Sequence, residues 1–326
     1  MSAKYKTRPS SSITRIFNCL ICTDSRGAGL EQTINRLPGV NEGLRSVNAE
    51  VRVEVIVRRG AKIQKLHEII DNHPRLPSLD FIIVAGGICN LTDRVTTPGC
   101  KKLTYTDRSK VSDLKEAITG LFRTYGQAIH VATIPAAGLA KYFECNNGLP
   151  PSNLEELKLQ QENLQEDVDT ANQLIVDNNK ERDLPTIPWA KQCTQTSKKR
   201  DHRTRKLRTV KKFCDKHLPD GVHPDDTLKE IWFKLVKDHI IKVVKKSQET
   251  EAALLDSTQS TESSDQETYN FKRKRKECTP GQPEQPRSAQ SSFEEGQSSY
   301  QDGDHSQSDQ EKWQHVGAKR RRQSKQ

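Results

Sequence analysis

The chain has 326 residues, of which 32% are hydrophobic and 5% aromatic, and its mean hydropathy is −0.83. A composition this polar cannot fill a packed core along the whole chain, so we expect one folded domain and a disordered remainder. No apolar run approaches the 18 residues that a membrane-spanning helix needs, and residues 1–12 lack an apolar signal core. Both features predict a soluble, unsecreted protein. The net charge of +10 favours an acidic partner.

Residues 13–30 form the stretch around which we expect the fold to be built, after a flexible polar leader over residues 1–12. Residues 16–22 are almost all apolar, which is typical of a strand buried on both faces of a parallel sheet. The apolar run stops at Thr23-Asp24-Ser25, and a short helix is predicted to follow. Ligands of open α/β sheets bind beyond the carboxyl ends of the strands. Ser25 is therefore either part of a helix cap or a nucleophile at such a site.

Strands and helices are predicted to alternate in the next hundred residues. Residues 51–57 alternate valine with charged side chains, which indicates a strand with one wetter face, close to a sheet edge. A helix over 63–72 and a buried strand over 81–85 follow, then a helix over 111–125 and a buried strand over 128–134. This order predicts a parallel sheet flanked by helices.

The second half of the chain becomes more polar toward its end. Residues 153–179 predict a helix whose leucine stripe packs on the core or, alternatively, pairs in a coiled coil. A basic insert at 191–216 and a turn at 218–224 precede a helix over 226–244. We assign 13–246 to the folded domain and 247–326 to a disordered tail. Two polybasic runs in this tail, 272–276 and 319–322, are either nuclear-import signals or nucleic-acid contacts.

Four short blocks occupy turns that follow predicted strands or precede the last helix. They are Asp24-Ser25, Arg59-Gly60-Ala61, Gly87-Ile88-Cys89-Asn90 and Asp220-Gly221-Val222-His223. Their order and spacing resemble the SGNH (GDSL-type) hydrolases, and the Asp-x-x-His pair is the most specific element. The resemblance implies a three-layer α/β/α fold with a central parallel sheet of about five strands. More narrowly, the chain looks like the SGNH-like domains in the first open reading frames of LINE-type retrotransposons. It is more distantly similar to the noncatalytic, RNA-binding version in the Oskar germ-plasm protein.

The resemblance implies a serine esterase or deacylase that needs no cofactor and acts on a small-molecule or lipid acyl ester. Ser25 would be the nucleophile, His223 the general base and Asp220 the group that orients the imidazole.

The resemblance also implies an oxyanion hole. Its donors would be the backbone N–H groups of Ser25 and Gly60 and a side-chain amide from the third block. The family pattern there is Gly-x-Asn-Asp, and an ungapped alignment places Cys89 at the asparagine. Asn90 could serve only if the loop shifts by one residue. The first block departs as well, because Thr23 stands where the family has glycine.

The basic insert favours a second class of function. Its cations are Lys198, Lys199, Arg200, Arg203, Arg205, Lys206, Arg208, Lys211 and Lys212. Cations that neutralise phosphates release counterions, so the alternative is a noncatalytic module that binds RNA or single-stranded DNA. A run of charge is also common on an ordinary solvated face. The predicted location is the cytoplasm, the nucleus or both.

The eight cysteines are irregularly spaced, which fits reduced thiols. Cys19 and Cys22 lie three residues apart on one predicted strand and should therefore face opposite sides, which argues against a zinc or redox pair. We assign no metal site. The chain also lacks the glycine fingerprints of Walker-type and Rossmann nucleotide sites.

Overall fold

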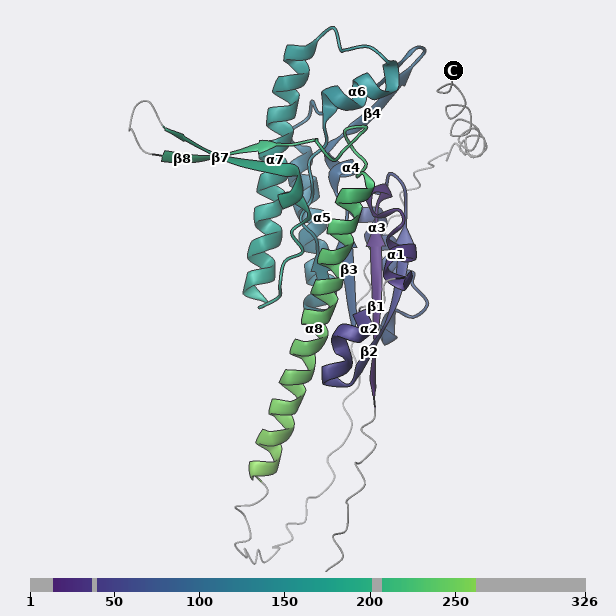
Figure 1. The fold of residues 1–326 in the computed structure, drawn as a ribbon, viewed down its shortest axis with the longest axis vertical. Helices are drawn as coiled ribbons and strands as arrows, with labels where there is room; N and C mark the ends of the chain where they lie inside the picture. The colour runs from purple at the N-terminus through teal and green to yellow at the C-terminus, as the bar shows by residue number, and fades with distance from the viewer. Residues whose placement is uncertain (1–13, 37–39, 201–206, 262–326) are drawn as a thin grey trace, which may run out of the picture. The chain divides into compact units, whose positions relative to one another are not determined.

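Four parallel strands form the sheet that positions the rest of the domain. The computed structural model describes residues 14–36, 40–200 and 207–261. The strands are β1 (Arg15–Thr23), β2 (Ala49–Val57), β3 (Phe81–Ala85) and β6 (Ile129–Val131). They lie in the order β2-β1-β3-β6, so β1 pairs with a neighbour on each side (Figure 1). β2 occupies an edge, as its alternating valines predicted.

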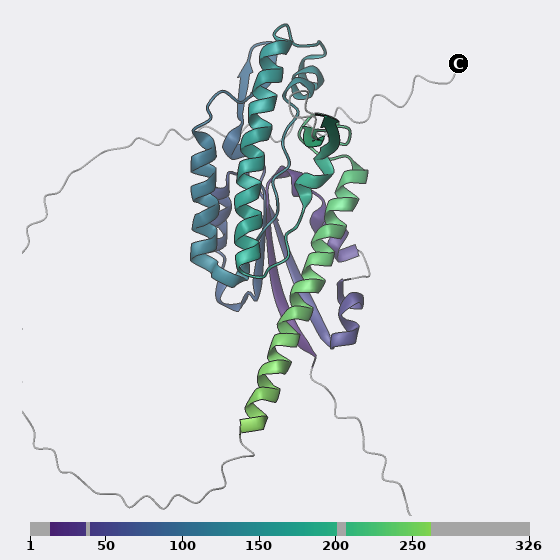
Figure 2. The same ribbon diagram turned by 90° about the vertical axis from the view of Figure 1, so that its left-hand side faces the viewer.

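Helices cover both faces of this sheet (Figures 1 and 2). The first face is covered by α3 (Ile63–Asp71), α5 (Lys110–Tyr125) and α7 (Leu154–Glu181), and the second by α1 (Leu30–Arg36), α2 (Val40–Leu44) and α8 (Asp226–Thr261). β1 contributes Leu20 and Cys22 to the first core and Cys19 and Ile21 to the second. The predicted three-layer α/β/α fold is therefore confirmed, and the two cysteines do face opposite sides.

Shorter elements connect the layers. They are η1 (Ser25–Gly27), η2 (Arg45–Val47), η3 (Leu76–Ser78), α4 (Ile88–Leu91), η4 (Gly126–Ala128), α6 (Leu139–Asn147) and η5 (Trp189–Cys193). Two antiparallel hairpins complete the described elements: β4 (Asp93–Thr97) with β5 (Cys100–Thr104), and β7 (Thr194–Arg200) with β8 (Leu207–Phe213). The β7–β8 hairpin projects away from the layers (Figure 1). The sequence predicted neither hairpin.

The sheet has four strands where about five were expected. Beyond β6, the parallel pairing is reduced to a single bridge between Ala132 and Ile187. Pro185 and Pro188 flank Ile187, and proline has no N–H to donate to a ladder, so this segment cannot continue as a strand.

The last helix is longer than predicted. α8 continues to Thr261, so the assignment of residues 247–261 to the disordered tail was wrong. These residues contain no Gly or Pro and include good helix formers such as Gln, Glu, Ala and Leu. Residues 262–326, with both polybasic runs, lie outside the described residues, as does the leader over 1–12.

The apolar stripe of α7 belongs to the core of the domain. Leu157, Leu164, Val168 and Ile175 are buried there, so they are not available for the coiled-coil alternative. Leu154, which was predicted to belong to the stripe, is 40% exposed. Within the described ranges, no helix combines the length and the apolar character needed to cross a membrane.

Candidate active site

The turn after β1 and the loop before α8 meet beyond the carboxyl end of β1. His223 Nε2 lies 3.0 Å from Ser25 Oγ, although the two residues are 198 positions apart in the chain. On the other side of the ring, His223 Nδ1 lies 2.6 Å from Asp220 Oδ2. The structure therefore brings the three predicted catalytic side chains into one hydrogen-bonded series.

The charge of Asp220 determines how protons are arranged in this series. Burial opposes its ionisation, but hydrogen bonds from the His223 side chain and from the His223 and Val222 backbone N–H groups outweigh burial and lower its pKa to about 2. An ionised carboxylate only accepts, so Nδ1 of His223 carries the ring proton and Nε2 accepts from Ser25 Oγ–H. The series can thus take a proton from the serine hydroxyl.

The Ser25 turn is shaped by its neighbours. Asp24 caps η1 by accepting from the Arg26 backbone N–H at 2.9 Å, so Asp24, not Ser25, is the helix cap. A Cβ on Gly27 would lie 2.3 Å from the Thr23 side chain. Gly27 therefore makes room for Thr23, which stands where the SGNH pattern has glycine.

Hydrogen bonds to the Asp220 carboxylate and to the segment around Gly138 hold the loop that carries His223. Asp220 Oδ1 accepts from the backbone N–H groups of Val222 and His223. Gly221 has φ +78°, and a Cβ there would lie 2.3 Å from the carbonyl oxygen of Gly138. The Gly138 N–H donates to the Gly221 carbonyl at 2.7 Å. Only glycine fits at 221, because both the backbone conformation and the close approach exclude a side chain.

Two of the predicted oxyanion donors are available. The backbone N–H groups of Ser25 and Gly60 have no acceptor within the described part of the chain. Gly60 lies in the turn after β2 at φ +70°, with no atom within 4 Å of the place a Cβ would occupy. The turn is fixed next to the Ser25 turn by a bond from the Arg58 N–H to the Thr23 carbonyl at 2.8 Å.

Asn90 does not take the position expected of the third donor. It is buried, its Oδ1 accepts from the Ile63 N–H at the start of α3, and its Nδ2 donates to Gln64 at 2.7 Å. Cys89 is only partly buried, and burial together with the negative charge of Asp24 raises its pKa to about 11. The side chain at position 89 is thus a neutral thiol, which is only a weak hydrogen-bond donor.

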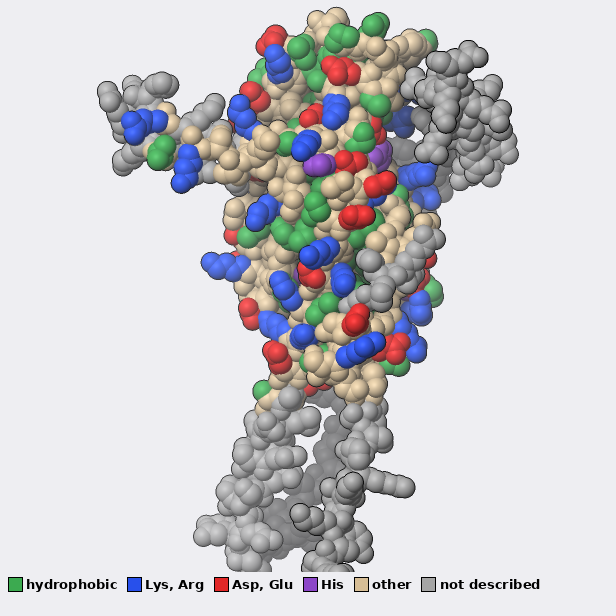
Figure 3. Space-filling model, viewed as in Figure 1, with side chains coloured by type: hydrophobic (Ala, Val, Ile, Leu, Met, Phe, Trp, Pro, Cys, Tyr) green, Lys and Arg blue, Asp and Glu red, His purple; other side chains and the backbone are tan. Residues whose placement is uncertain are grey.

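The basic insert is mostly the β7–β8 hairpin. Lys198, Lys199 and Arg200 lie on β7, and Arg208, Lys211 and Lys212 lie on β8, whereas Arg203, Arg205 and Lys206 lie outside the described residues. The described side chains of Lys198, Arg200 and Lys212 are exposed. Figure 3 shows Lys and Arg side chains along the projecting hairpin, whereas cations and acids are mixed over the layers.

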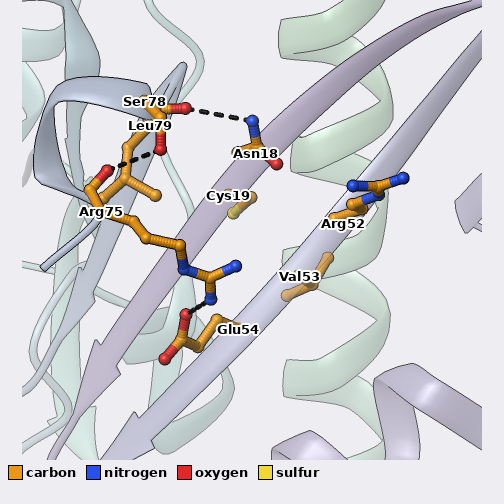
Figure 4. Close-up of a pocket in the computed structure, with 8 residues that line it drawn as sticks. All are labelled: Asn18, Cys19, Arg52, Val53, Glu54, Arg75, Ser78 and Leu79. Carbon is orange, nitrogen blue, oxygen red and sulfur yellow. Dashed lines mark hydrogen bonds and ion pairs between the residues drawn. The ribbon is translucent and has the colours of Figure 1, made fainter.

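A small cavity of about 90 Å³ lies away from Ser25, beside the first half of β1 (Figure 4). Its lining residues are Asn18, Cys19, Arg52, Val53, Glu54, Arg75, Ser78 and Leu79. The guanidinium of Arg75 pairs with Glu54 inside it. The described residues hold no group of three or more His, Cys, Asp and Glu side chains arranged to bind a metal ion.

Sequence reasoning missed three residues that shape the site: Arg26, Gly27 and Gly138. Arg26 follows Ser25 directly, and its side chain is only 2% exposed. A cation next to a candidate nucleophile was the available signal for Arg26. The two glycines act through contacts with Thr23 and Gly221, which only the fold reveals.

No protein-family model and no curated protein sequence matches the chain. Among solved structures it is similar to a lipase/acylhydrolase from Enterococcus faecalis, with 16% identity, TM-score 0.40 and coverage of 69% of this chain and 96% of that one. A GDSL-like lipase from Bacteroides thetaiotaomicron is 11% identical with a TM-score of 0.41, and the match covers 69% of this chain and 88% of that one. The acetylxylan esterase Axe2 from Geobacillus stearothermophilus is 12% identical with a TM-score of 0.41, and the match covers 69% of this chain and 94% of that one. Similarities this distant decide neither the family nor the activity of the chain, and the LINE and Oskar resemblances and the cellular location stay predictions.

Proposed function

We propose that this chain is a serine ester hydrolase of the SGNH type, an esterase or deacylase. The observation that carries the proposal is the hydrogen-bonded series from Ser25 Oγ through His223 to the ionised Asp220. The N–H groups of Ser25 and Gly60 support it, since they are unpaired within the described residues and lie in adjacent turns.

In the proposed reaction, Ser25 Oγ attacks the ester carbonyl carbon while its proton passes to His223 Nε2. The carbonyl oxygen becomes an oxyanion that the Ser25 and Gly60 N–H groups stabilise. When the tetrahedral intermediate collapses, the C–O bond to the alcohol breaks, and the imidazolium gives its proton to that alcohol. His223 then takes a proton from a water molecule, which attacks the acyl carbonyl; the C–O bond to Ser25 Oγ breaks, the imidazolium returns its proton to Oγ, and the acid is released. Asp220 keeps the imidazole in the required tautomer throughout.

Labelling with a fluorophosphonate probe, together with turnover of p-nitrophenyl acetate, tests the proposal. We expect wild-type protein to be labelled covalently, labelling to be lost in Ser25→Ala and His223→Ala, and turnover in both variants to fall about 10³-fold or more, to a small residual rate. Ser152→Ala, at an exposed serine before α7, is the matched control and should behave as wild type. Folded wild-type protein that is neither labelled nor active would refute the hydrolase.

We propose RNA or single-stranded DNA binding by the β7–β8 hairpin as a second candidate function. The favouring observation is that the two strands pair over seven residues each and contain no Asp or Glu to offset their cations. Such a hairpin can bind a nucleic-acid backbone without taking part in the serine chemistry.

Salt dependence of binding to a fluorescent single-stranded RNA separates this function from the first. The triple variant Lys198→Gln/Arg200→Gln/Lys212→Gln should bind more weakly and lower the slope of log K against log salt by about two, because each lost phosphate contact removes about 0.7. Ser25→Ala should bind as wild type. The matched control is the triple variant Arg123→Gln/Lys180→Gln/Lys234→Gln, which neutralises exposed cations of α5, α7 and α8, away from the hairpin. Equal weakening by both triple variants would argue against a hairpin site.

A further inference from the structure

The guanidinium of Arg26 lies at a junction of three chain segments next to the candidate nucleophile. Its Nε donates to the Val222 carbonyl at 3.1 Å, its Nη2 donates to the Ala136 carbonyl at 3.0 Å, and its Nη1 donates to the Pro135 carbonyl. One side chain therefore ties the Ser25 turn to the loop of His223 and to the segment after β6.

These contacts leave Arg26 no role as a contact to substrate. The side chain is 2% exposed, and each guanidinium nitrogen already faces a backbone carbonyl. Burial of a cation is costly unless it is hydrogen-bonded and compensated. Burial raises the pKa of the neighbouring Asp24, and the charge of Arg26 offsets part of that rise, so the two groups interact electrostatically. The buried guanidinium thus has a structural role: it holds the carbonyls of Val222, Pro135 and Ala136.

The carbonyl that Nε holds belongs to Val222, the residue directly before His223. A second hydrogen bond, from the Gly138 N–H to the Gly221 carbonyl, holds the same loop. Ala136 lies two residues before Gly138, so Arg26 contacts both sides of this junction. A shift of the Val222 carbonyl would move the His223 imidazole relative to Ser25 Oγ.

We propose that Arg26 is a positioning residue that sets the Ser25–His223 distance by holding the Val222 carbonyl. The inference rests on the proposed hydrolase function. Misplacement of a reacting group by about 1 Å can cost about 100-fold in rate, so loss of this anchor should act on turnover and not on substrate binding.

Arg26→Lys keeps the positive charge but cannot reach three carbonyls at once. We expect its kcat for p-nitrophenyl acetate to fall about 10- to 100-fold with KM changed less than threefold. In a His223→Ala background, the same substitution should have no further effect on residual turnover, because a positioning residue acts only through the group it positions. An equal loss in both backgrounds, or a kcat equal to that of wild type, would overturn the proposal.

A readout independent of activity separates this inference from the hydrolase itself. Hydrogen–deuterium exchange of the 218–224 segment should become faster in Arg26→Lys and in Arg26→Met. Arg182→Lys is the matched control: Arg182 also donates to two backbone carbonyls, those of Asn178 and Gly126, at the far end of α7. It should leave that segment unchanged. Unchanged exchange in the folded Arg26 variants would refute the anchor, whereas faster exchange in a protein without His223-dependent turnover would leave the anchor and refute the hydrolase.

Discussion

Asp220 offers a sharp test at the scale of a single residue. In Asp220→Asn, the side-chain oxygen can still accept from the Val222 and His223 N–H groups, so the loop should keep its shape. The amide can donate to Nδ1, which favours the tautomer whose Nε2 proton points at Ser25. The same change in the triad of serine proteases lowers kcat by about 10⁴, and we expect a loss of 10²–10⁴ in steady-state turnover. Asp226→Asn, at a 99% exposed side chain, is the control. Turnover equal to that of wild type would show that Asp220 does not orient the base.

Cys89 is the residue that the ungapped alignment places at the third donor of the oxyanion hole. A neutral thiol donates weakly, whereas a carboxamide there would add a third donor to the oxyanion hole. We expect Cys89→Asn to raise kcat for p-nitrophenyl acetate about tenfold or more. Cys145→Asn, at an exposed cysteine of α6, should leave kcat unchanged. Unchanged or lower turnover in a folded Cys89→Asn protein would mean that this side chain does not face the oxyanion.

The sequence could predict that Ser25, Asp220 and His223 meet, because the Ser25 block follows a strand end and the Asp220–His223 block precedes the last helix, in the order of the SGNH pattern that the chain resembles. It could not decide between Cys89 and Asn90. That choice depends on α4, which begins at Ile88 and directs Asn90 to the start of α3. Arg26 was missed for a similar reason: its partners are backbone carbonyls more than a hundred positions away, which no local pattern reveals.

At the scale of the element, the loop between β8 and α8 depends on one glycine. Gly221→Ala would place a Cβ 2.3 Å from the Gly138 carbonyl oxygen at φ +78°. We expect turnover to fall at least 100-fold and the unfolding free energy to fall by about 2–3 kcal/mol in urea titrations. Gly148→Ala has a similar φ of +73° but open space around the Cβ. It should cost only about 1–2 kcal/mol and leave turnover unchanged. Equal effects of the two substitutions would show that the contact with Gly138 is unimportant.

Several elements with a clear apolar pattern were predicted closely, although the buried strand predicted over 128–134 is only Ile129–Val131 in the structure, and the polar elements were missed. β3 and α5 have continuous or periodic apolar residues, and their predicted bounds agree with the structure to within one residue. β7 contains only Thr, Gln, Ser, Lys and Arg, and the three apolar residues of β8, Leu207, Val210 and Phe213, recur every third position, so neither strand shows the two-residue alternation that predicts a strand. The end of α8 lacks an apolar stripe as well, and its helix formers alone did not distinguish it from the polar tail.

At the scale of the whole molecule, the layering was predictable because each buried strand needs cover on both faces. The sequence did not show that α8 closes the second face over a pair of histidines. His130 of β6 and His239 of α8 are buried with their rings 4.8 Å apart. Nδ1 of His130 and both ring nitrogens of His239 lack partners within the described residues. Burial lowers the pKa of His130 to about 4, and the charge of Arg182 adds to this. Burial, His130 and Lys242 also lower the pKa of His239.

This pair makes the packing of α8 sensitive to acid. Unfolding returns His130 to its ordinary pKa of about 6.5, so between pH 6.5 and 4 the unfolded chain binds more protons than the folded one. The unfolding free energy therefore rises with pH in this window. The contribution is complete above pH 6.5, and on the order of 3 kcal/mol of it is lost by pH 4. His239 acts in the same direction.

His130→Leu removes one of these groups and keeps the strand apolar. Urea titrations at pH 7 and pH 4 should show a fall in unfolding free energy that is smaller than in wild type by on the order of 3 kcal/mol. Ile129→Val, at the neighbouring buried position, leaves both imidazoles in place and should cost about 1 kcal/mol equally at both pH values. If the wild-type and His130→Leu proteins lost the same free energy on acidification, the histidine pair would not be what couples this layer to pH.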